Sequence, residues 1–402
     1  KDMGVKLQIK EMNFTALIGA LKTGKIDLIV SGMSKTPERE KEVNFSTPYL
    51  YETQVMVIRK ADKAKYKSIA DFSGKRVGAQ KQTTQEQLAK TQLPGAKVTS
   101  LDKANDVVAQ ISYNKLDAGV LASTIADSYV ARTPSLTVID PHFATDKAPT
   151  AIAVSKQSPA LLKQVNKTIS KVKGAKYKSY LQAAYKLQDQ DQGFWAKYGN
   201  YFIRGAIYTL VFAVLTVLFG TIIGTLLALM KLSRNWLAKV VANIYIEFIR
   251  GTPLLVQAFI VFFGTQILGL DLSAFVAGAI AMAINSGAYV AEIIRGGINS
   301  VPVGQTEAAR SLGLHQSQAM RYVILPQAMK NIWPALGNEF VTDIKESSVL
   351  SVIGATELMF EGTVVQGASF KPFLPLVVVA ILYFIMTFTL SRLLRLIEKR
   401  FN

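Results

Sequence analysis

The sequence predicts an α/β domain in residues 1–190, a linker that enters the membrane over 191–204, and an all-α membrane domain in residues 205–402. Two observations carry this prediction. The first region is rich in lysine and alternates short apolar runs with stretches of helical periodicity, whereas the last contains long segments without a charged side chain. A chain of 402 residues has room for two or three domains.

Four uncharged runs in the second half are long enough to cross a bilayer. The first has 26 residues and the other three have 20 each: Gly205–Met230, Gly251–Leu270, Leu272–Ala291 and Pro372–Ser391. A helix needs about 20 apolar residues to span the hydrocarbon core, so we expect each run to be a membrane span. Thr252 and Pro253 are expected to begin the second span, as hydroxyl cap and first helical residue.

A fifth span is expected over Asn331–Ala355, although this stretch contains Glu339 and Asp343. Ionisable side chains at membrane depth face a protein interior or a wet cavity, and the alternative is an interfacial segment. Basic residues concentrate in alternate connections, which requires an odd number of spans. Five transmembrane helices place the C-terminus in the cytoplasm and residues 1–200 outside the plasma membrane.

Short apolar strands alternate with helical segments in the first region. The expected strands are Lys25–Val30, Gln54–Ile58, Arg76–Ala79, Ala118–Leu121 and Thr150–Val154, and the expected helices are Phe14–Thr23, Ala104–Tyr113 and Ser158–Val172. This alternation is typical of an α/β domain with largely parallel sheets. Gly19–Lys25 has the spacing of a phosphate-binding loop, but it ends a helix and lacks the following Ser or Thr, so we expect no nucleotide there.

Composition excludes several classes of function. The chain has no Cys and only two His, which lie far apart, so neither thiol chemistry, a disulfide framework nor a metal site is expected. The net charge of +18 comes from scattered basic residues without an accompanying aromatic stripe, which argues against nucleic-acid binding. We expect no catalytic residues and no cofactor in this chain.

Three segments near the start carry a resemblance to a known family. Phe14–Val30, Ser31–Arg39 and Val43–Tyr49 closely resemble the bacterial polar-amino-acid-binding proteins, and Thr150–Lys156 resembles the strand by which their chain returns to the first lobe. The resemblance covers about residues 1–185. It implies two α/β lobes that close on a ligand through a hinge, as in periplasmic binding proteins.

The resemblance also implies a set of ligand-binding residues: Phe14, Gly32, Ser34, Arg39 and Thr83. Arg39 stands where the family binds the ligand carboxylate, and a guanidinium binds a carboxylate with two parallel hydrogen bonds. Gly32 and Ser34 would complete the carboxylate's surroundings, Phe14 would pack on the ligand side chain, and Thr83 would supply a hydroxyl from the second lobe. The alternative for Arg39 is a surface ion pair with Glu38 or Glu42.

Three departures from the family concern the same site. Ala122 stands where family members carry the Asp that holds the ligand ammonium, and Gln82 replaces a usual Gly. The sequence opens with Lys1 and without a signal peptide, so we expect a start that is truncated or processed, with the family's first strand missing. The site is therefore expected to hold a carboxylate better than an ammonium.

Residues 200–402 resemble the permease subunits of ATP-binding-cassette importers for polar amino acids. The motif consists of Glu307–Gly313, nine further residues and Val323–Pro326. Arg250–Gln257 and Asn285–Gly297 are also typical of that family. The motif predicts a short helix, a Gly that turns the chain and a Pro that starts or bends a second segment. A loop of this kind can dock on another protein.

The implied coupling loop spans residues 300–330, and its key residues are Glu307, Ala308, Ala309, Gly313, Leu325 and Pro326. The resemblance implies a cytoplasmic ATPase subunit that carries ATP and Mg, and a second permease subunit that we expect to be identical. The expected topology places this loop inside the cell.

Polar side chains on the third span are candidates for the membrane pathway. Asn285 and Tyr289 lie four residues apart, and Glu292 follows on nearly the same face. A zwitterionic amino acid needs a polar lining at membrane depth. The alternatives are hydrogen bonds between packed spans and, for Glu292, an ion pair with Arg295.

The predicted function is therefore import of a polar amino acid by a transporter subunit that is not an enzyme. A ligand-gated channel or receptor also joins a binding module to membrane helices, but it needs no ATPase-docking loop. A third hypothesis is a permease whose fused binding domain is a non-functional remnant.

Overall fold

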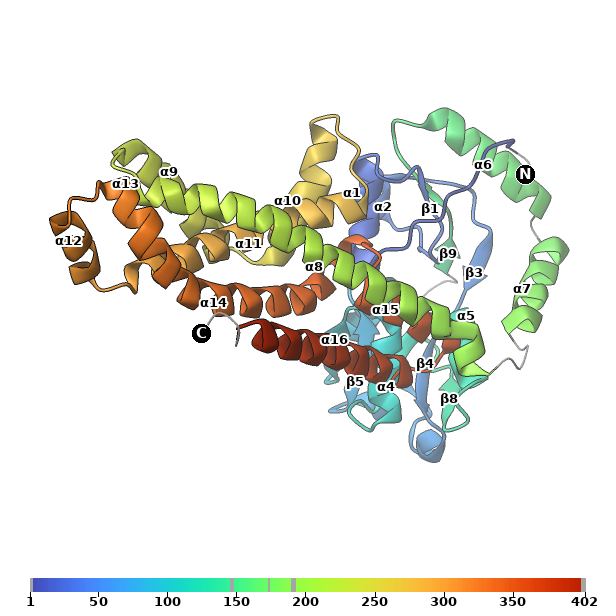
Figure 1. The fold of residues 1–402 in the computed structure, drawn as a ribbon. Coiled ribbons are helices and arrows are strands. Elements are labelled where there is room, and N and C mark those ends of the chain that lie inside the picture. The colour runs from blue at the N-terminus through green and yellow to red at the C-terminus, as the bar shows by residue number, and fades with distance from the viewer. Residues whose placement is uncertain (1–2, 145–147, 173, 189–192, 399–402) are drawn as a thin grey trace. The chain divides into compact units, whose positions relative to one another are not determined.

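A computed structural model describes residues 3–144, 148–172, 174–188 and 193–398. The chain divides into two compact units, Lys1–Gly199 with Thr363–Leu376, and Asn200–Gly362 with Val377–Asn402 (Figure 1). Each unit is described by itself. Residues 191 and 192 of the expected linker lie outside the described residues.

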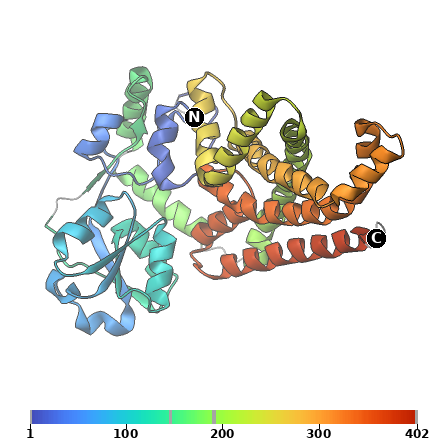
Figure 2. The same cartoon turned by 90° about the vertical axis from the view of Figure 1, so that its left-hand side faces the viewer.

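The second lobe of the first unit is a five-stranded sheet in the order β6-β5-β7-β4-β8. The strands are β4 (Gln54–Arg59), β5 (Arg76–Gln80), β6 (Lys97–Leu101), β7 (Ala118–Ala122) and β8 (Leu136–Ile139), and the helices are α3 (Thr84–Gln92), α4 (Ala104–Ser112) and α5 (Ser123–Val130). Figure 2 shows this lobe, in blue and teal, after a quarter turn. Met56 and Ile58 pack with α3 on one face, while Val55 and Val57 pack with α4 and α5 on the other, so both faces of the sheet are buried.

The first lobe is smaller and is built around a three-stranded sheet in the order β1-β10-β2. Its elements are a 3-10 turn (Phe14–Ala16), α1 (Leu17–Lys22), β1 (Leu28–Ile29), α2 (Pro37–Glu42), β2 (Asn44–Phe45), β10 (Ala153–Val154), α6 (Pro159–Val172) and α7 (Ala175–Gln188). The chain passes between the lobes twice. The two passages are paired as antiparallel strands, β3 (Leu50–Glu52) and β9 (Ala148–Thr150).

The prediction of largely parallel sheets was wrong. In the second lobe β5 is parallel to β6 and β7, but β4 is antiparallel to β7 and β8. In the first lobe β10 is antiparallel to both β1 and β2. The reversed strand in each lobe is the one by which the chain enters from the other lobe. Such a strand needs no crossover helix, so the strand-helix alternation of the sequence does not reveal its direction.

The second unit is helical. Its elements are α8 (Phe194–Leu232), α9 (Trp236–Gly251), α10 (Leu254–Ile267), α11 (Ala274–Asn299), α12 (Val303–Ser311), α13 (Gln316–Ala319), a π turn (Met320–Ile324), α14 (Leu325–Glu346), a 3-10 segment (Ser347–Ile353), α15 (Leu358–Ser369) and α16 (Leu374–Glu398). Within the described residues, α8, α11 and α16 are long and apolar enough to cross a membrane. Two bent pairs bring the count to five if each is one span.

Each bent pair overlaps one expected span, but most of α9 and all of α15 lie outside the expected spans. The second span contains α10, which has only 14 residues and lies at 106° to α9. The span expected over Asn331–Ala355 contains most of α14 and the 3-10 segment, after which the chain bends by 50° into α15. Thr252 does not cap the start of α10 as expected, because its hydroxyl donates to the carbonyl of Phe248 at 2.9 Å and so ends α9. Pro253 precedes the first helical residue instead of occupying it.

Glycines allow α8 and α11 to approach closely. A Cβ atom added at Gly224 would lie 2.6 Å from the Cβ of Val290 and 2.9 Å from the backbone nitrogen of Ala291. A Cβ added at Gly287 would lie 2.7 Å from a methyl carbon of Ile223. Small residues at such crossings let membrane helices gain packing energy, so this contact fixes the position of α11.

We predict that Gly224→Ala lowers the thermal unfolding midpoint of the purified chain, because the added methyl group costs about 1–3 kcal/mol of overpacking against Val290. Gly264→Ala in α10 is the matched control, since nothing lies within 4 Å of its Cβ position. That control should be neutral or stabilising, because Ala favours a helix over Gly. Equal midpoints for the two variants would show that this helix contact does not limit stability.

Candidate functional site

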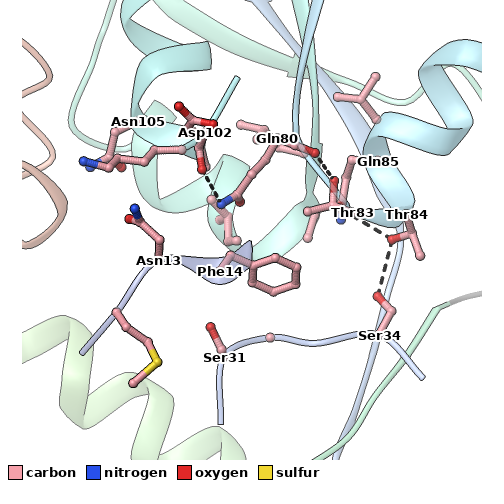
Figure 3. A pocket seen from close by; sticks show the side chains of 18 of the residues that line it. Asn13, Phe14, Ser31, Ser34, Gln80, Thr83, Thr84, Gln85, Asp102 and Asn105 are labelled. Carbon is pink, nitrogen blue, oxygen red and sulfur yellow. Dashed lines mark hydrogen bonds between the residues drawn. The ribbon is translucent and has the colours of Figure 1, made fainter. Parts of the chain in front are cut away.

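A cavity of about 300 Å³ lies in the first unit between its two lobes. All five residues predicted to bind ligand line it: Phe14, Gly32, Ser34, Arg39 and Thr83. The first four come from the first lobe and Thr83 from the second. Figure 3 shows the ring of Phe14 and the side chains of Ser34 and Thr83 around this space. The structure therefore brings together residues that are as much as 69 positions apart in the sequence.

Arg39 lies at the start of α2, where Thr36 caps the helix and Pro37 fixes its first turn. One terminal nitrogen of the guanidinium donates to the carbonyl of Ser34 and the other to the carbonyl of Gln82, both at 2.7 Å. Its central carbon lies 5.4 Å from the centre of the Phe14 ring. Burial lowers the pKa of Arg39 from its ordinary value, against the opposing effect of Glu38.

The surface ion pair considered for Arg39 is not what the structure shows. Glu42 pairs with Lys22 instead. Arg39 directs its two terminal nitrogens to carbonyl groups, and its role in ligand binding stays a prediction. A guanidinium has five N–H groups, and the two in use leave three for a ligand carboxylate.

The hydroxyl of Thr83 has a structural task at the start of α3. It donates to the carbonyl of Gln80 at 2.6 Å and accepts from the backbone N–H of Glu86 at 3.2 Å, as a helix cap does. The hydroxyl of the next residue, Thr84, lies 3.4 Å from that of Ser34 across the cavity. Sequence reasoning missed Thr84, although it belongs to the same Lys81–Thr84 stretch. The start of α3 also presents the positive end of the helix dipole to the cavity.

The side of the cavity expected to hold an ammonium has an unusual composition. Ala122 ends β7 and lies in the wall, so no carboxylate projects from that strand end. Among the described residues that line the cavity, Asp102 supplies the acidic side chain, and it pairs with Lys81 at 3.0 Å. Asn105 and Gln85 add amide groups nearby (Figure 3). The sequence does not single out Asp102, because it directly follows a strand of ordinary pattern.

The predicted coupling loop forms the connection from α11 to α14. Glu307, Ala308 and Ala309 lie in α12. Gly313 has a φ of +85° and ends that helix, with the backbone N–H of Leu314 donating to the carbonyl of Ala309 at 3.2 Å. This pattern is a helix end that requires the left-handed conformation, which Gly adopts without strain.

The prediction was that Pro326 starts or bends the second segment of this loop, and the structure shows that it does not start that segment. That segment begins at Gln316 and runs through the π turn into α14, whose first residues are Leu325 and Pro326. A π turn accommodates a residue that lacks a backbone donor, so the chain stays helical through the Pro. The segment is tied back to α12 by a hydrogen bond from Gln327 to Gln305 at 3.3 Å.

The three candidate pathway residues lie in α11 and differ in their surroundings. Asn285 is buried and donates to the side chain of Gln257 in α10 at 3.1 Å. Glu292 pairs with Lys231 at 2.7 Å and with Arg295 at 2.8 Å. Tyr289 is half-buried, and the guanidinium of Arg250 lies 5.4 Å from the centre of its ring. Asn285 therefore makes an interhelical hydrogen bond, which was its alternative interpretation, and Glu292 makes the ion pair with Arg295 that was its own. The second ion pair of Glu292, with Lys231, joins α11 to α8.

We predict that these positions differ in access to water. With a single Cys introduced into this Cys-free chain, Tyr289→Cys should react with a water-soluble thiol reagent, and Asn285→Cys should react at least tenfold more slowly. The reason is that Tyr289 is partly exposed within its unit whereas Asn285 is buried. Equal rates at the two positions would contradict the packing of α10 against α11.

Within the described residues, no group of three His, Cys, Asp or Glu side chains lies close enough to hold a metal ion. The chain thus offers a cavity lined by hydrogen-bonding groups and a helical membrane unit with an exposed loop.

Comparison with known proteins matches these two parts to two families. Residues 1–185 match bacterial extracellular solute-binding proteins, family 3, and residues 220–402 match the binding-protein-dependent transport system inner membrane component. A crystal structure of an amino acid ABC transporter with histidines is 51% identical, with a TM-score of 0.50, and the match covers 51% of this chain and 96% of that one.

Relatives of known name match one half of the chain. A putative glutamine transport system permease protein of Rickettsia bellii is 42% identical over 201 residues, which are 50% of this chain and 92% of the relative. The glutamine transport system permease protein of Escherichia coli is 40% identical over 200 residues, or 49% and 91%. An arginine transport system permease protein of Bacillus subtilis is 37% identical over 201 residues, or 50% and 92%.

Proposed function

We propose that this chain, which belongs to the permease family of amino acid ATP-binding-cassette transporters and carries a fused family 3 solute-binding domain, imports polar amino acids into the cell. It is an integral membrane protein. The observation that carries the proposal is the position of Arg39, whose guanidinium lines a cavity between two lobes in a chain that also has a permease unit.

The cavity suits a small ligand with a carboxylate. Its volume of about 300 Å³ lies at the lower end of the range for ligand sites, which fits one amino acid better than a peptide. Arg39 supplies the charge for the carboxylate, the start of α3 adds backbone donors, and Ser34 and Thr84 supply hydroxyl groups. Phe14 offers an apolar ring to the ligand side chain.

Polar amino acids are the substrate class that the relatives support. The named relatives transport glutamine or arginine by their names, and the related crystal structure contains histidines. The amide and acidic groups of Gln85, Asn105 and Asp102 fit a polar side chain better than an aliphatic one. The remnant hypothesis rests on Ala122 and predicts that the intact chain binds no amino acid.

The direction of transport follows from the proposed orientation. The basic residues after α8 and at the end of α16 support a cytoplasmic location for those helix ends, with the binding domain outside. The loop 300–330 would then dock on a cytoplasmic ATPase subunit that holds ATP and Mg. A second permease subunit, identical to this one, would complete the membrane pathway. A ligand-gated channel needs no loop that docks on an ATPase.

The first test is binding. In the intact chain in lipid nanodiscs, Arg39→Ala should weaken binding of the preferred amino acid on the order of 30-fold or more, because a truncated charge pair costs at least ~2 kcal/mol. Arg76→Ala is the control, since Arg76 lies at the far end of β5 and pairs with Asp117. Calorimetry measures both, and unchanged affinity in Arg39→Ala would refute the ligand-binding role.

The second test is coupling. Gly313→Val and Glu307→Arg should abolish most ATP-dependent uptake in proteoliposomes while leaving amino acid binding unchanged. Gly269→Val is the matched control, because Gly269 also has a positive φ of +80° and an open Cβ position, but lies in the connection between α10 and α11. If the two Gly variants lose uptake equally, the loss reflects backbone strain and not docking.

A further inference from the structure

The turn before α3 contains a residue in a strained conformation. Gln82 has a φ of +59°, which a residue other than Gly adopts at a cost of roughly 1–2 kcal/mol. Glu86 stabilises this conformation, because its carboxylate accepts a hydrogen bond from the backbone N–H of Gln82 at 2.7 Å. The cap formed by Thr83 closes the same turn from the other side. Strained residues that the surroundings hold in place are frequent at ligand sites.

The strained conformation directs a carbonyl group across the cavity. The Gln82 oxygen accepts from Arg39 at 2.7 Å, and Arg39 belongs to the other lobe. The Ser34 carbonyl accepts from the second terminal nitrogen at the same distance. One carbonyl from each lobe therefore fixes the plane of the guanidinium. Because the second-lobe carbonyl comes from a turn whose direction is set by Glu86, the orientation of Arg39 depends on Glu86.

Glu86 is itself firmly held. Lys90 donates to its other carboxylate oxygen at 2.6 Å, and Ser100 on β6 donates to that same oxygen. Burial acts to raise the pKa of Glu86, but the hydrogen bonds from Lys90, Ser100 and Gln82 lower it below its ordinary value. The carboxylate does not line the cavity, so it reaches a ligand only through the turn.

We propose that Glu86 and the Gln82 turn form a clamp that orients Arg39 for the ligand carboxylate. This inference rests on the proposed function, because it assigns Glu86 as a positioning residue for amino acid binding. The competing explanation is a helix cap that serves stability alone. The two explanations differ in whether Glu86 and Arg39 act on the same binding step.

The test compares three variants of the intact chain in nanodiscs, titrated with L-glutamine, L-arginine and L-histidine, using the tightest binder for the comparison. Glu86→Ala should weaken binding about tenfold, because the turn loses the bond that directs its carbonyl. Glu86→Gln should stay within about twofold of the unmodified chain, because its amide oxygen still accepts the N–H of Gln82. Gln82→Pro removes both this donor and the positive φ, so it should reproduce the loss if Glu86→Ala does not fold.

The matched control is Asp71→Ala. Asp71 accepts from the backbone N–H groups of Lys67 and Ser68 at 2.7 and 2.8 Å, so it caps a turn of the same lobe away from the cavity. This variant should lower the thermal midpoint without changing affinity. If Glu86→Ala behaves in the same way, the proposal is overturned.

A double-mutant cycle separates positioning from stability. In an Arg39→Lys background the planar fork is already lost, so Glu86→Ala should cost less than twofold. An equal loss in both backgrounds overturns the clamp but leaves amino acid binding intact. If the unmodified chain binds none of the three amino acids, both the proposed function and the clamp fail.

Discussion

A partly buried guanidinium needs hydrogen-bond acceptors, and Arg39 finds them on both lobes of the binding domain. Much of the local structure serves this requirement. Thr36 and Pro37 start α2 so that Arg39 lies in its first turn, and the loop that ends at Ser34 supplies one carbonyl. The second lobe supplies the other through the strained Gln82. In the proposed function, a ligand carboxylate would bind the N–H groups of the guanidinium that these two carbonyls leave free.

Buried polar groups in the membrane unit also need hydrogen-bond partners. Polar groups there are matched in pairs between helices, such as Asn285 with Gln257 and Ser286 with Asp343. Close Gly contacts hold α8 against α11, which carries Asn285 and Ser286. The coupling loop begins where α11 ends and returns into α14, so a movement of the loop reaches both helices directly. In the proposed function, this connection would carry a movement of the docked ATPase to the centre of the membrane unit.

The sequence revealed the elements more reliably than their directions. Five uncharged or mixed runs marked the membrane segments, because lipid excludes charge, but nothing in the runs indicated the 106° bend at Pro253. The five predicted strands lie within a few residues of β1, β4, β5, β7 and β10, whereas β2, β3, β6 and β8 were not predicted. The direction of the reversed strands β4 and β10 depends on how the chain passes between lobes. The five predicted ligand residues line one cavity, and they were predicted from the resemblance to amino-acid-binding proteins. Thr84 and Asp102 were missed, since their contacts with Ser34 and Lys81 are distant in sequence. Glu86 was missed although its contacts with Gln82 and Lys90 are local, because the sequence does not show that the Gln82 turn contacts Arg39.

The most direct test of the central claim is accumulation. Proteoliposomes that contain the chain and its ATPase subunit, with ATP and Mg enclosed in the lumen, are given a labelled polar amino acid from outside. If this chain is the permease of an ATP-driven importer, the label rises inside well above its external concentration and stays at background when the enclosed nucleotide cannot be hydrolysed. Entry that stops at the external concentration and does not depend on ATP would show a channel and contradict the account.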